Sequence, residues 1–257
     1  MSLLRRVALA GLWLAVGPLA AQVPEAQRRS GFEFMSPQIQ AMQREDSQNP
    51  ALLWVQQGAA LWQTPAGPLS KSCASCHGEV SRLRGVATRY PAFDTGLNRP
   101  LNLAQRINQC RQNHQQAPAW RLESAELLGL ESLVGLQSRG LPLSPPTDAR
   151  MQAVVAQGQQ RYLQRLGQLD LSCAQCHDQR WGQRLGGTTI PQAHPTGYPL
   201  YRLEWQGVGS LQRRLRNCLS GVRAQAFALG SVELVELEAY LAWQARGMPL
   251  ETPGVRP

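Results

Sequence analysis

The stretches 72-SCASCH-77 and 172-SCAQCH-177 decide the fold of this chain. In each, a histidine directly follows the second of two cysteines that stand three residues apart. This CxxCH spacing is the attachment signature of c-type haem, because both thiols add to vinyl groups and the adjacent imidazole binds the iron. A zinc site would need more ligands at short spacing, and a dithiol redox pair would not need the histidine twice. The sequence predicts two covalent haems. The attachment residues are Cys73, Cys76, His77, Cys173, Cys176 and His177.

The two motifs belong to a repeat that runs through the chain. Three further blocks recur in the same order. They are YPAF from Tyr90 and YPLY from Tyr198, LAQRINQC ending at Cys110 and LQRRLRNC ending at Cys218, and the blocks starting SAELL at Ser124 and SVELV at Ser231. Such order indicates an internal duplication. The proline-rich stretch 141–150 fits a linker, so we expect an N-terminal domain over 22–145 and a C-terminal domain over 146–257.

Each half has the pattern of a helical domain. A serine at 231, early glutamates, and Gly247 with Pro249 predict a helix over 231–246. The segments between each CxxCH motif and the following lone cysteine are rich in Gly, Pro and Thr, which favours loops. No run alternates clearly enough to predict a strand. We therefore expect an all-α fold of two tandem cytochrome c-like domains.

The first 21 residues have the composition of a secretory signal peptide. Arg5 and Arg6 precede an apolar run, and Leu19 and Ala21 suit the two recognition positions before the cleavage site. The apolar run is too short for a comfortable membrane span. We expect a periplasmic protein without stable membrane insertion. The net charge of +9 comes almost entirely from arginine, and we expect no nucleic-acid partner from it.

Cys110 and Cys218 remain after the haem motifs, and both recur at the same place in the repeat. Helical periodicity places each on the apolar face of a helix, so each thiol is expected to point into its domain. The residues sharing these faces are Leu103 and Ile107 with Cys110, and Leu211, Leu215 and Val222 with Cys218. A thiol in that position could bind haem iron. A Cys110–Cys218 disulfide and two inert buried thiols remain as alternatives.

Other residues bear on which group binds the iron. Met248 stands in RGMPL where the first half has RGLPL, so it cannot be a shared ligand. Arg106 and Arg214 each precede the lone cysteine by four positions, one helical turn away, where a cation favours the thiolate. His114 and His194 have no evident role. We expect distal ligation by the two cysteines.

Taken together, the two CxxCH motifs, LNLAQRINQCR, LQRRLRNC and RGMP resemble the SoxA family, the haem c subunits of the SoxAX complexes of bacterial sulfur oxidation. The resemblance covers the mature chain and, with the first CxxCH intact, is to the two-haem branch. It implies L-cysteine S-thiosulfotransferase activity. With a SoxX-like monohaem cytochrome in a heterodimer, such a protein couples thiosulfate oxidatively to a cysteine of a SoxYZ-like carrier. It passes two electrons to a c-type cytochrome.

The resemblance also implies roles for individual residues. His77 and Cys110 would hold one iron, and His177 and Cys218 the other. Cys218 would be the catalytic cysteine, which the family carries as a persulfide, and Arg214 the cation that binds substrate.

From the residues themselves we expect Arg213, Arg214 and Arg216 to form an anion site, because guanidinium groups bind oxyanions in a forked geometry. QRINQC has one arginine where RRLRNC has three, so the second haem is expected to be catalytic and the first a relay or a remnant. Two alternatives stay open: a dihaem electron carrier without its own catalysis, and a thiosulfate dehydrogenase that forms tetrathionate.

Overall fold

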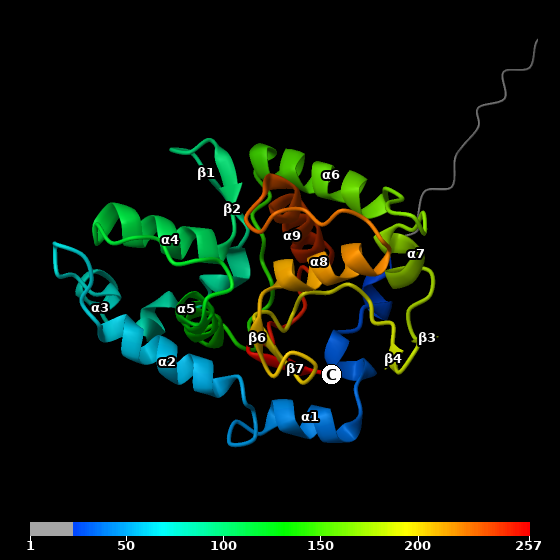
Figure 1. Ribbon diagram of the computed structural model, residues 1–257, viewed down its shortest axis with the longest axis horizontal. Helices are drawn as coiled ribbons and strands as arrows, with labels where there is room; N and C mark the ends of the chain where they lie inside the picture. The colour runs from blue at the N-terminus through cyan, green and yellow to red at the C-terminus, as the bar shows by residue number, and fades with distance from the viewer. Residues whose placement is uncertain (1–22) are drawn as a thin grey trace, which may run out of the picture.

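Two pairs of crossed helices form the frame of the molecule. The computed structural model describes residues 23–257, so the predicted signal peptide lies outside the described residues. In the first half α2 (Leu52–Gln63) packs across α5 (Ala125–Leu136), and in the second half α6 (Ala149–Leu163) packs across α9 (Val232–Gln244). Figure 1 shows the first pair (cyan and green) beside the second (green and dark red). The predicted helix over 231–246 is confirmed by α9, which Ser231 caps.

Glycines set the closeness of these crossings. A Cβ added at Gly58 of α2 would collide with the carbonyl of Gly129 on α5, and one at Gly158 of α6 would collide with that of Glu236 on α9. Only a residue without a side chain allows the two backbones to approach this closely. Gly58 and Gly158 stand 100 residues apart, as the two CxxCH motifs do. The two halves therefore use the same helix crossing.

Shorter elements connect the frame. The other α-helices are α1 (Pro37–Arg44), α3 (Cys73–His77), α4 (Leu103–His114), α7 (Cys173–His177) and α8 (Leu211–Gly221). The 3₁₀ helices are η1 (Glu25–Gln27), η2 (Gly31–Phe34), η3 (Val80–Leu83) and η4 (Ala87–Arg89). Within residues 23–257 no helix is long and apolar enough to cross a membrane.

The expectation of an all-α fold without strands is wrong in detail. The described strands are β1 (Ala92–Asp94), β2 (Arg99–Leu101), β3 (Arg184–Leu185), β4 (Thr188–Thr189), β5 (Leu200–Arg202), β6 (Gly207–Gly209) and β7 (Gly254–Arg256). β1–β2, β3–β4 and β5–β6 are antiparallel hairpins, and β7 joins β5 in parallel. Each strand has two or three residues, too few for alternation to appear in the sequence.

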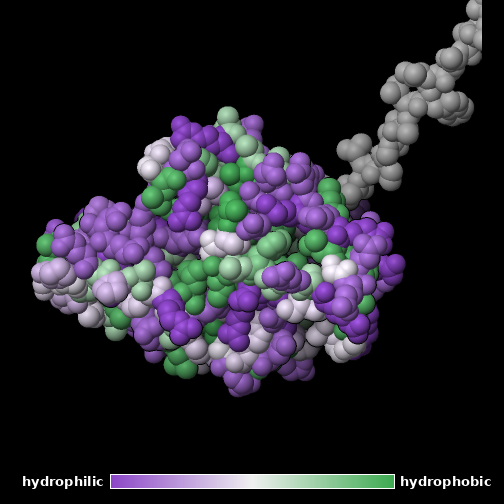
Figure 2. Space-filling model, turned by 45° about the horizontal axis from the view of Figure 1, so that its top comes forward, coloured by the Kyte–Doolittle hydropathy of each residue, from purple (hydrophilic) through white to green (hydrophobic). Residues whose placement is uncertain are grey.

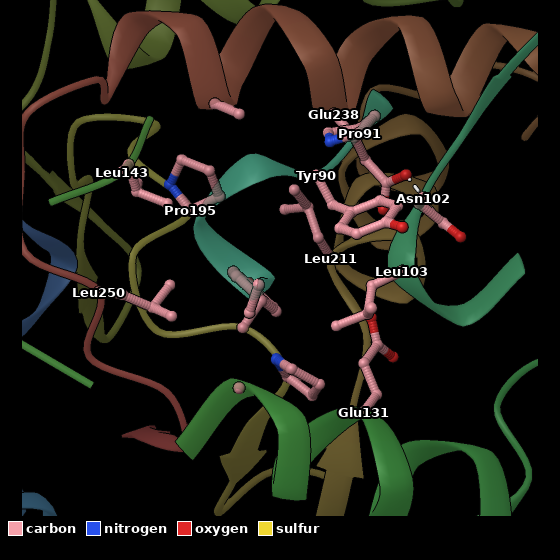
Figure 3. Close-up of a pocket in the computed structure, with 15 residues that line it drawn as sticks. Tyr90, Pro91, Asn102, Leu103, Glu131, Leu143, Pro195, Leu211, Glu238 and Leu250 are labelled. Atoms are coloured by element: carbon pink, nitrogen blue, oxygen red, sulfur yellow. Dashed lines mark hydrogen bonds between the residues drawn. The ribbon is translucent and has the colours of Figure 1, made fainter. Parts of the chain in front are cut away.

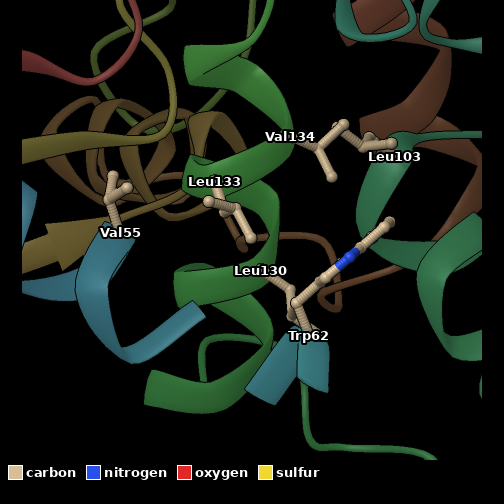
Figure 4. Packing of buried hydrophobic residues seen from close by; sticks show 6 residues of the cluster. All are labelled: Val55, Trp62, Leu103, Leu130, Leu133 and Val134. Carbon is tan, nitrogen blue, oxygen red and sulfur yellow. The ribbon is translucent and has the colours of Figure 1, made fainter. Parts of the chain in front are cut away.

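Each half has its own hydrophobic core, and further apolar clusters join the two halves. In the first half Trp62, Leu103 and Leu130 pack in one apolar cluster (Figure 4), and in the second half Tyr162 and Tyr240 lie in another. The hairpins join the halves, since Tyr201 of β5 packs in a cluster with Leu128 of α5. Phe93 of β1 packs in turn against a cluster that α6 and α9 form. The repeat makes Phe93 and Tyr201 equivalent, so each half inserts its hairpin against the helices of the other.

The N-terminal segment 23–51 lies on the second half, although the chain reaches it first. The backbone N–H of Arg29 donates to Oε1 of Gln192 at 2.7 Å, and Asn49 Nδ2 donates to the carbonyl of Pro253 at 3.0 Å. Figure 1 shows this blue segment and α1 beside the C-terminal strand β7. The residues predicted as the start of the N-terminal domain therefore help to cover the C-terminal one.

Candidate functional site

The second CxxCH motif forms a short capped helix. Ser172 Oγ accepts a hydrogen bond from the backbone of Gln175 at 3.3 Å, and Gln175 Oε1 accepts one from the backbone of Ser172 at 2.8 Å. This reciprocal capping fixes the turn that carries Cys173 and Cys176. The His177 ring is held by a 2.7 Å hydrogen bond between Nδ1 and the carbonyl of Pro191, which leaves Nε2 to face the cavity.

Cys218 reaches the same place from α8. Its thiol is hydrogen-bonded to His177. Leu211, Leu215 and Cys218 line one cavity of about 460 Å³, as the predicted inward face requires. Val222, the fourth residue of that predicted face, is the C-cap of α8 and does not line the cavity. The structure thus brings together the CxxCH histidine and the lone cysteine of the second half.

The environment of Cys218 favours its thiolate. Burial raises the pKa of the Cys218 thiol, but the hydrogen bond from His177 and the positive charges of Arg214 and Arg202 outweigh it, and the pKa falls below its usual value. Arg214 lines the cavity and forms no ion pair within residues 23–257. Its full charge is therefore available to an anion beside the sulfur.

The corresponding site of the first half is arranged differently. His77 packs against Trp62, with 5.8 Å between ring centroids. Cys110 lies close enough to Cys73 and Cys76 for their charges to interact. Burial raises the pKa of the Cys110 thiol, and the charge of Arg106 does not overcome it. The pKa of the lone thiol is therefore raised in the first half and lowered in the second.

One exchanged residue contributes to this difference. Arg106 forms an ion pair with Asp94 of β1, with 2.8 Å between Nη2 and Oδ2. The repeat places Arg202 of β5 at the position of Asp94. Arg202 lines the Cys218 cavity, its Nη2 pairs with exposed Glu204 at 3.1 Å, and its buried Nε has no hydrogen-bond partner. Asp94 thus neutralises Arg106 in the first half, whereas Arg202 adds a second positive charge to that of Arg214 in the second half.

The predicted cluster of three arginines is wrong in its membership. Arg213 lies over the Trp205 ring, with 4.2 Å from Cζ to the centroid, and lines a separate surface hollow with Arg216 and Glu123. A helix turns by about 100° per residue, so the positions five and two before Cys218 point away from it. Only Arg214 of the three faces Cys218, and Arg202 takes the place of the other two.

Several lining residues were missed by reasoning from motifs. Phe34 and Met35 bring the N-terminal segment to the Cys218 cavity, and Arg184 and Arg256 line it from the β3–β4 hairpin and β7. His194, which had no predicted role, holds this segment through a 2.8 Å hydrogen bond between its Nδ1 and the carbonyl of Arg29. The only available signal was that residues 23–51 stand outside the repeat.

The structure also describes the six cysteines, His114 and Met248. All six cysteines are unpaired, so the structure contains no Cys110–Cys218 disulfide among the residues described. His114 is exposed at the end of α4. Met248 packs against Leu143, Ala245 and Leu250 rather than in the Cys218 cavity.

The donor set fits covalent haem. The Cys173 and Cys176 thiols are free for attachment, while His177 and Cys218 supply a nitrogen and a thiolate sulfur at one cavity. Apolar side chains of α8 and α9 line that cavity, and arginines suit the carboxylate groups that haem carries. Figure 2 shows apolar residues gathered in the central part of one face, between hydrophilic margins. In the first half Cys73, Cys76 and His77 form the same short helix.

Comparison with known proteins gives a consistent result. The family model of the SoxA/TsdA cytochrome c domain matches residues 57–143 and 157–250. The chain is 34% identical over 229 residues to the L-cysteine S-thiosulfotransferase subunit SoxA of Rhodovulum sulfidophilum, covering 89% of this chain and 80% of that one. The SoxA subunit of Paracoccus pantotrophus is 30% identical over 227 residues, which are 88% of this chain and 78% of that one. The crystal structure of SoxXA from P. pantotrophus superposes with a TM-score of 0.86 and 30% identity, covering 90% of this chain and 87% of that chain.

Proposed function

The chain belongs to the SoxA/TsdA cytochrome c family, and we propose that it is a SoxA-type L-cysteine S-thiosulfotransferase that couples thiosulfate oxidatively to a carrier cysteine. In this reaction a sulfur–sulfur bond forms between the terminal sulfur of thiosulfate and the carrier thiol. The thiol proton is released, and two electrons leave the sulfur atoms. The observation that carries the assignment of the site is that Cys218, Arg214 and Arg202 line one cavity.

The arginines bind and orient the substrate in this proposal. Thiosulfate is a dianion, and a guanidinium group can donate two parallel hydrogen bonds to its oxygens. Within residues 23–257 Arg214 has no ion-pair partner to displace, and the buried Nε of Arg202 is an unused donor. Their charges hold the anion beside the Cys218 sulfur, which is the catalytic cysteine here.

Covalent haem supplies the one-electron acceptor at this site when it is attached. His177 and Cys218 are the proposed iron ligands in the second half, and His77 and Cys110 those in the first, which gives two haems per chain. The hydrogen bond that His177 Nδ1 donates to the carbonyl of Pro191 holds the ring in one orientation.

The second half is the catalytic one in this proposal. Asp94 neutralises Arg106 in the first half, so an anion would find no free cation beside Cys110. The first haem then serves as a relay. This division follows from an internal duplication that we infer from the repeat, with domains over 22–145 and 146–257.

The same proposal includes partners and a compartment. A SoxX-like monohaem cytochrome forms the heterodimer, by analogy with the SoxXA complex of P. pantotrophus. A SoxYZ-like protein carries the accepting cysteine, a c-type cytochrome takes the electrons, and the predicted signal peptide leads to the periplasm.

A reconstituted assay tests the function. The haem-loaded chain with a SoxX cytochrome should reduce a c-type cytochrome with thiosulfate only when a SoxYZ carrier is present. Mass spectrometry should then find thiosulfate on the carrier cysteine. Tetrathionate formed by the chain without a carrier would instead support a thiosulfate dehydrogenase, and electron transfer without any use of thiosulfate would support a plain carrier of electrons.

A further inference from the structure

A cavity of about 90 Å³ lies between the two halves, away from both CxxCH motifs. Its fifteen lining residues are seven pairs of positions that the repeat makes equivalent, together with Asn102. Tyr90 and Tyr198 form one such pair, and Leu103 and Leu211 another. The two halves therefore meet here through the same surface, as subunits do around a two-fold axis.

Glu131 and Glu238 are an equivalent pair that projects into this cavity. Figure 3 shows Glu131 entering from α5 and Glu238 from α9, on opposite sides. Their partners are unequal. Glu238 Oε2 accepts hydrogen bonds from Asn102 Nδ2 and Gln212 Nε2, both at 3.0 Å, whereas Glu131 Oε2 is buried without a partner. Two carboxyl groups in a mostly apolar cavity resist being ionised together.

Among the described residues that line the cavity, none is a cation that would hold both charges. The other titratable groups that line the cavity are Tyr90 and Tyr198, and Glu123 adds a further negative charge nearby. Burial, helped by the charges of Glu238 and Glu123, raises the pKa of Glu131 to about 8. Burial raises the pKa of Glu238 to about 7, against the two amide hydrogen bonds. Both carboxyl groups thus hold a proton more tightly than an exposed glutamate does.

The position of Glu238 links it to both cysteine helices. Asn102 is the N-cap of α4, which carries Cys110 eight residues later, and Gln212 lies in the first turn of α8, which carries Cys218 six residues later. At a rise of 1.5 Å per residue, α4 spans about 12 Å from Asn102 to Cys110, and α8 spans about 9 Å from Gln212 to Cys218. A unit charge at about 10 Å changes proton affinity by about tenfold at an effective dielectric constant of about 20.

We propose that Glu131 and Glu238 form a proton-binding site shared by the two halves, which takes up a proton from solvent when an electron enters either half. The proton returns to solvent when the electron leaves for the acceptor cytochrome. Charge is balanced, since one proton offsets one electron, and no bond other than the carboxyl O–H forms or breaks. This inference rests on the proposed function only in requiring an electron-accepting haem in each half.

The test is a potentiometric titration of the haem-loaded protein, followed by its visible absorption, at pH values on both sides of pH 7 and 8. Added electrons raise proton affinity, so the midpoint potentials should fall as pH rises. A tenfold change in affinity corresponds to about 59 mV for one electron. Glu131→Gln and Glu238→Gln should each remove part of this fall, and the double variant all of it. Glu126→Gln, in the first turn of the same α5, should keep it.

Two further measurements test the same pair of carboxyl groups. Infrared difference spectra of the wild-type protein should gain a protonated-carboxyl C=O band on reduction, which Glu131→Gln or Glu238→Gln reduces. Asn102→Ser keeps an N-cap residue but removes the amide donor to Glu238, so it should move the pH-dependent step to higher pH.

Potentials of the wild-type protein that do not vary with pH would overturn the proposal, as would a fall retained in the double variant. If added Ca²⁺ abolished the fall of the midpoint potentials with rising pH, the two glutamates would form a cation site instead of a proton-binding site. Normal thiosulfate coupling in a protein whose midpoint potentials do not vary with pH would refute the proton-binding site but not the proposed function. A pH-dependent potential in a chain that never uses thiosulfate would refute the proposed function alone.

Discussion

Replacement of Arg214 by alanine gives the most direct test of the catalytic site. Arg214 is the unpaired cation beside Cys218, so Arg214→Ala removes a charged hydrogen bond to the substrate anion. Such a bond contributes roughly 1.5–3 kcal/mol. The expected loss is therefore about ten- to a hundredfold or somewhat more in kcat/KM for thiosulfate, measured with carrier and SoxX-type partner present. Arg214→Lys should recover only part of it, because an ammonium cannot fork onto two oxygens.

Arg106→Ala is the matched control, four residues before Cys110 in the repeat. Arg106 is engaged by Asp94, so its removal should lower thermal stability through the unpaired carboxylate and leave thiosulfate turnover nearly unchanged. Haem content is measured in each variant, because loss of fold would imitate loss of function. Normal turnover by Arg214→Ala together with an inactive Arg106→Ala would refute the reasoning and assign catalysis to the first half.

The remaining predictions concern the haem groups and the second arginine. Replacement of Cys173 and Cys176 by alanine should halve the haem absorbance per chain, and full absorbance would contradict two covalent haems. Cys110→Met should change one of two thiolate-type low-spin signals in electron paramagnetic resonance, while Met248→Leu should leave both unchanged; a signal lost in the latter would make Met248 a ligand. Arg202→Asp places at this position the negative charge that Asp94 has in the first half. The KM for thiosulfate should therefore rise at least as much as in Arg214→Ala. An unchanged KM would show that Arg202 does not bind the substrate.

Much of the local structure could be predicted because its signals are local. Ser172 and Ser231 cap helices that begin where a serine precedes a helical pattern. The inward face of α8 followed from its period, and the same period could have excluded Arg213 and Arg216, which stand about 140° and 160° around the helix from Cys218.

The parts that could not be predicted depend on contacts between distant segments. Strands of three residues are stabilised by pairing with a partner strand and leave no periodic pattern. The covering of the Cys218 cavity by Phe34 and Met35 arises from packing across the whole chain. Arg202 could have been found from the sequence. It directly follows the block YPLY, as Asp94 directly follows YPAF. Extending the alignment of the two blocks by one residue would have shown that an arginine replaces an aspartate.

The exchange at this position also explains how one repeated fold can hold two different sites. Both halves keep the helix pair, the capped CxxCH turn and a lone cysteine on the next long helix. The difference lies in what faces the arginine that precedes that cysteine. Asp94 forms an ion pair with Arg106, and burial raises the pKa of the Cys110 thiol. In the second half the hydrogen bond from His177 and the charges of Arg214 and Arg202 lower the pKa of the Cys218 thiol. In the proposed division of roles, this change of charge on a hairpin strand favours anion binding in the second half.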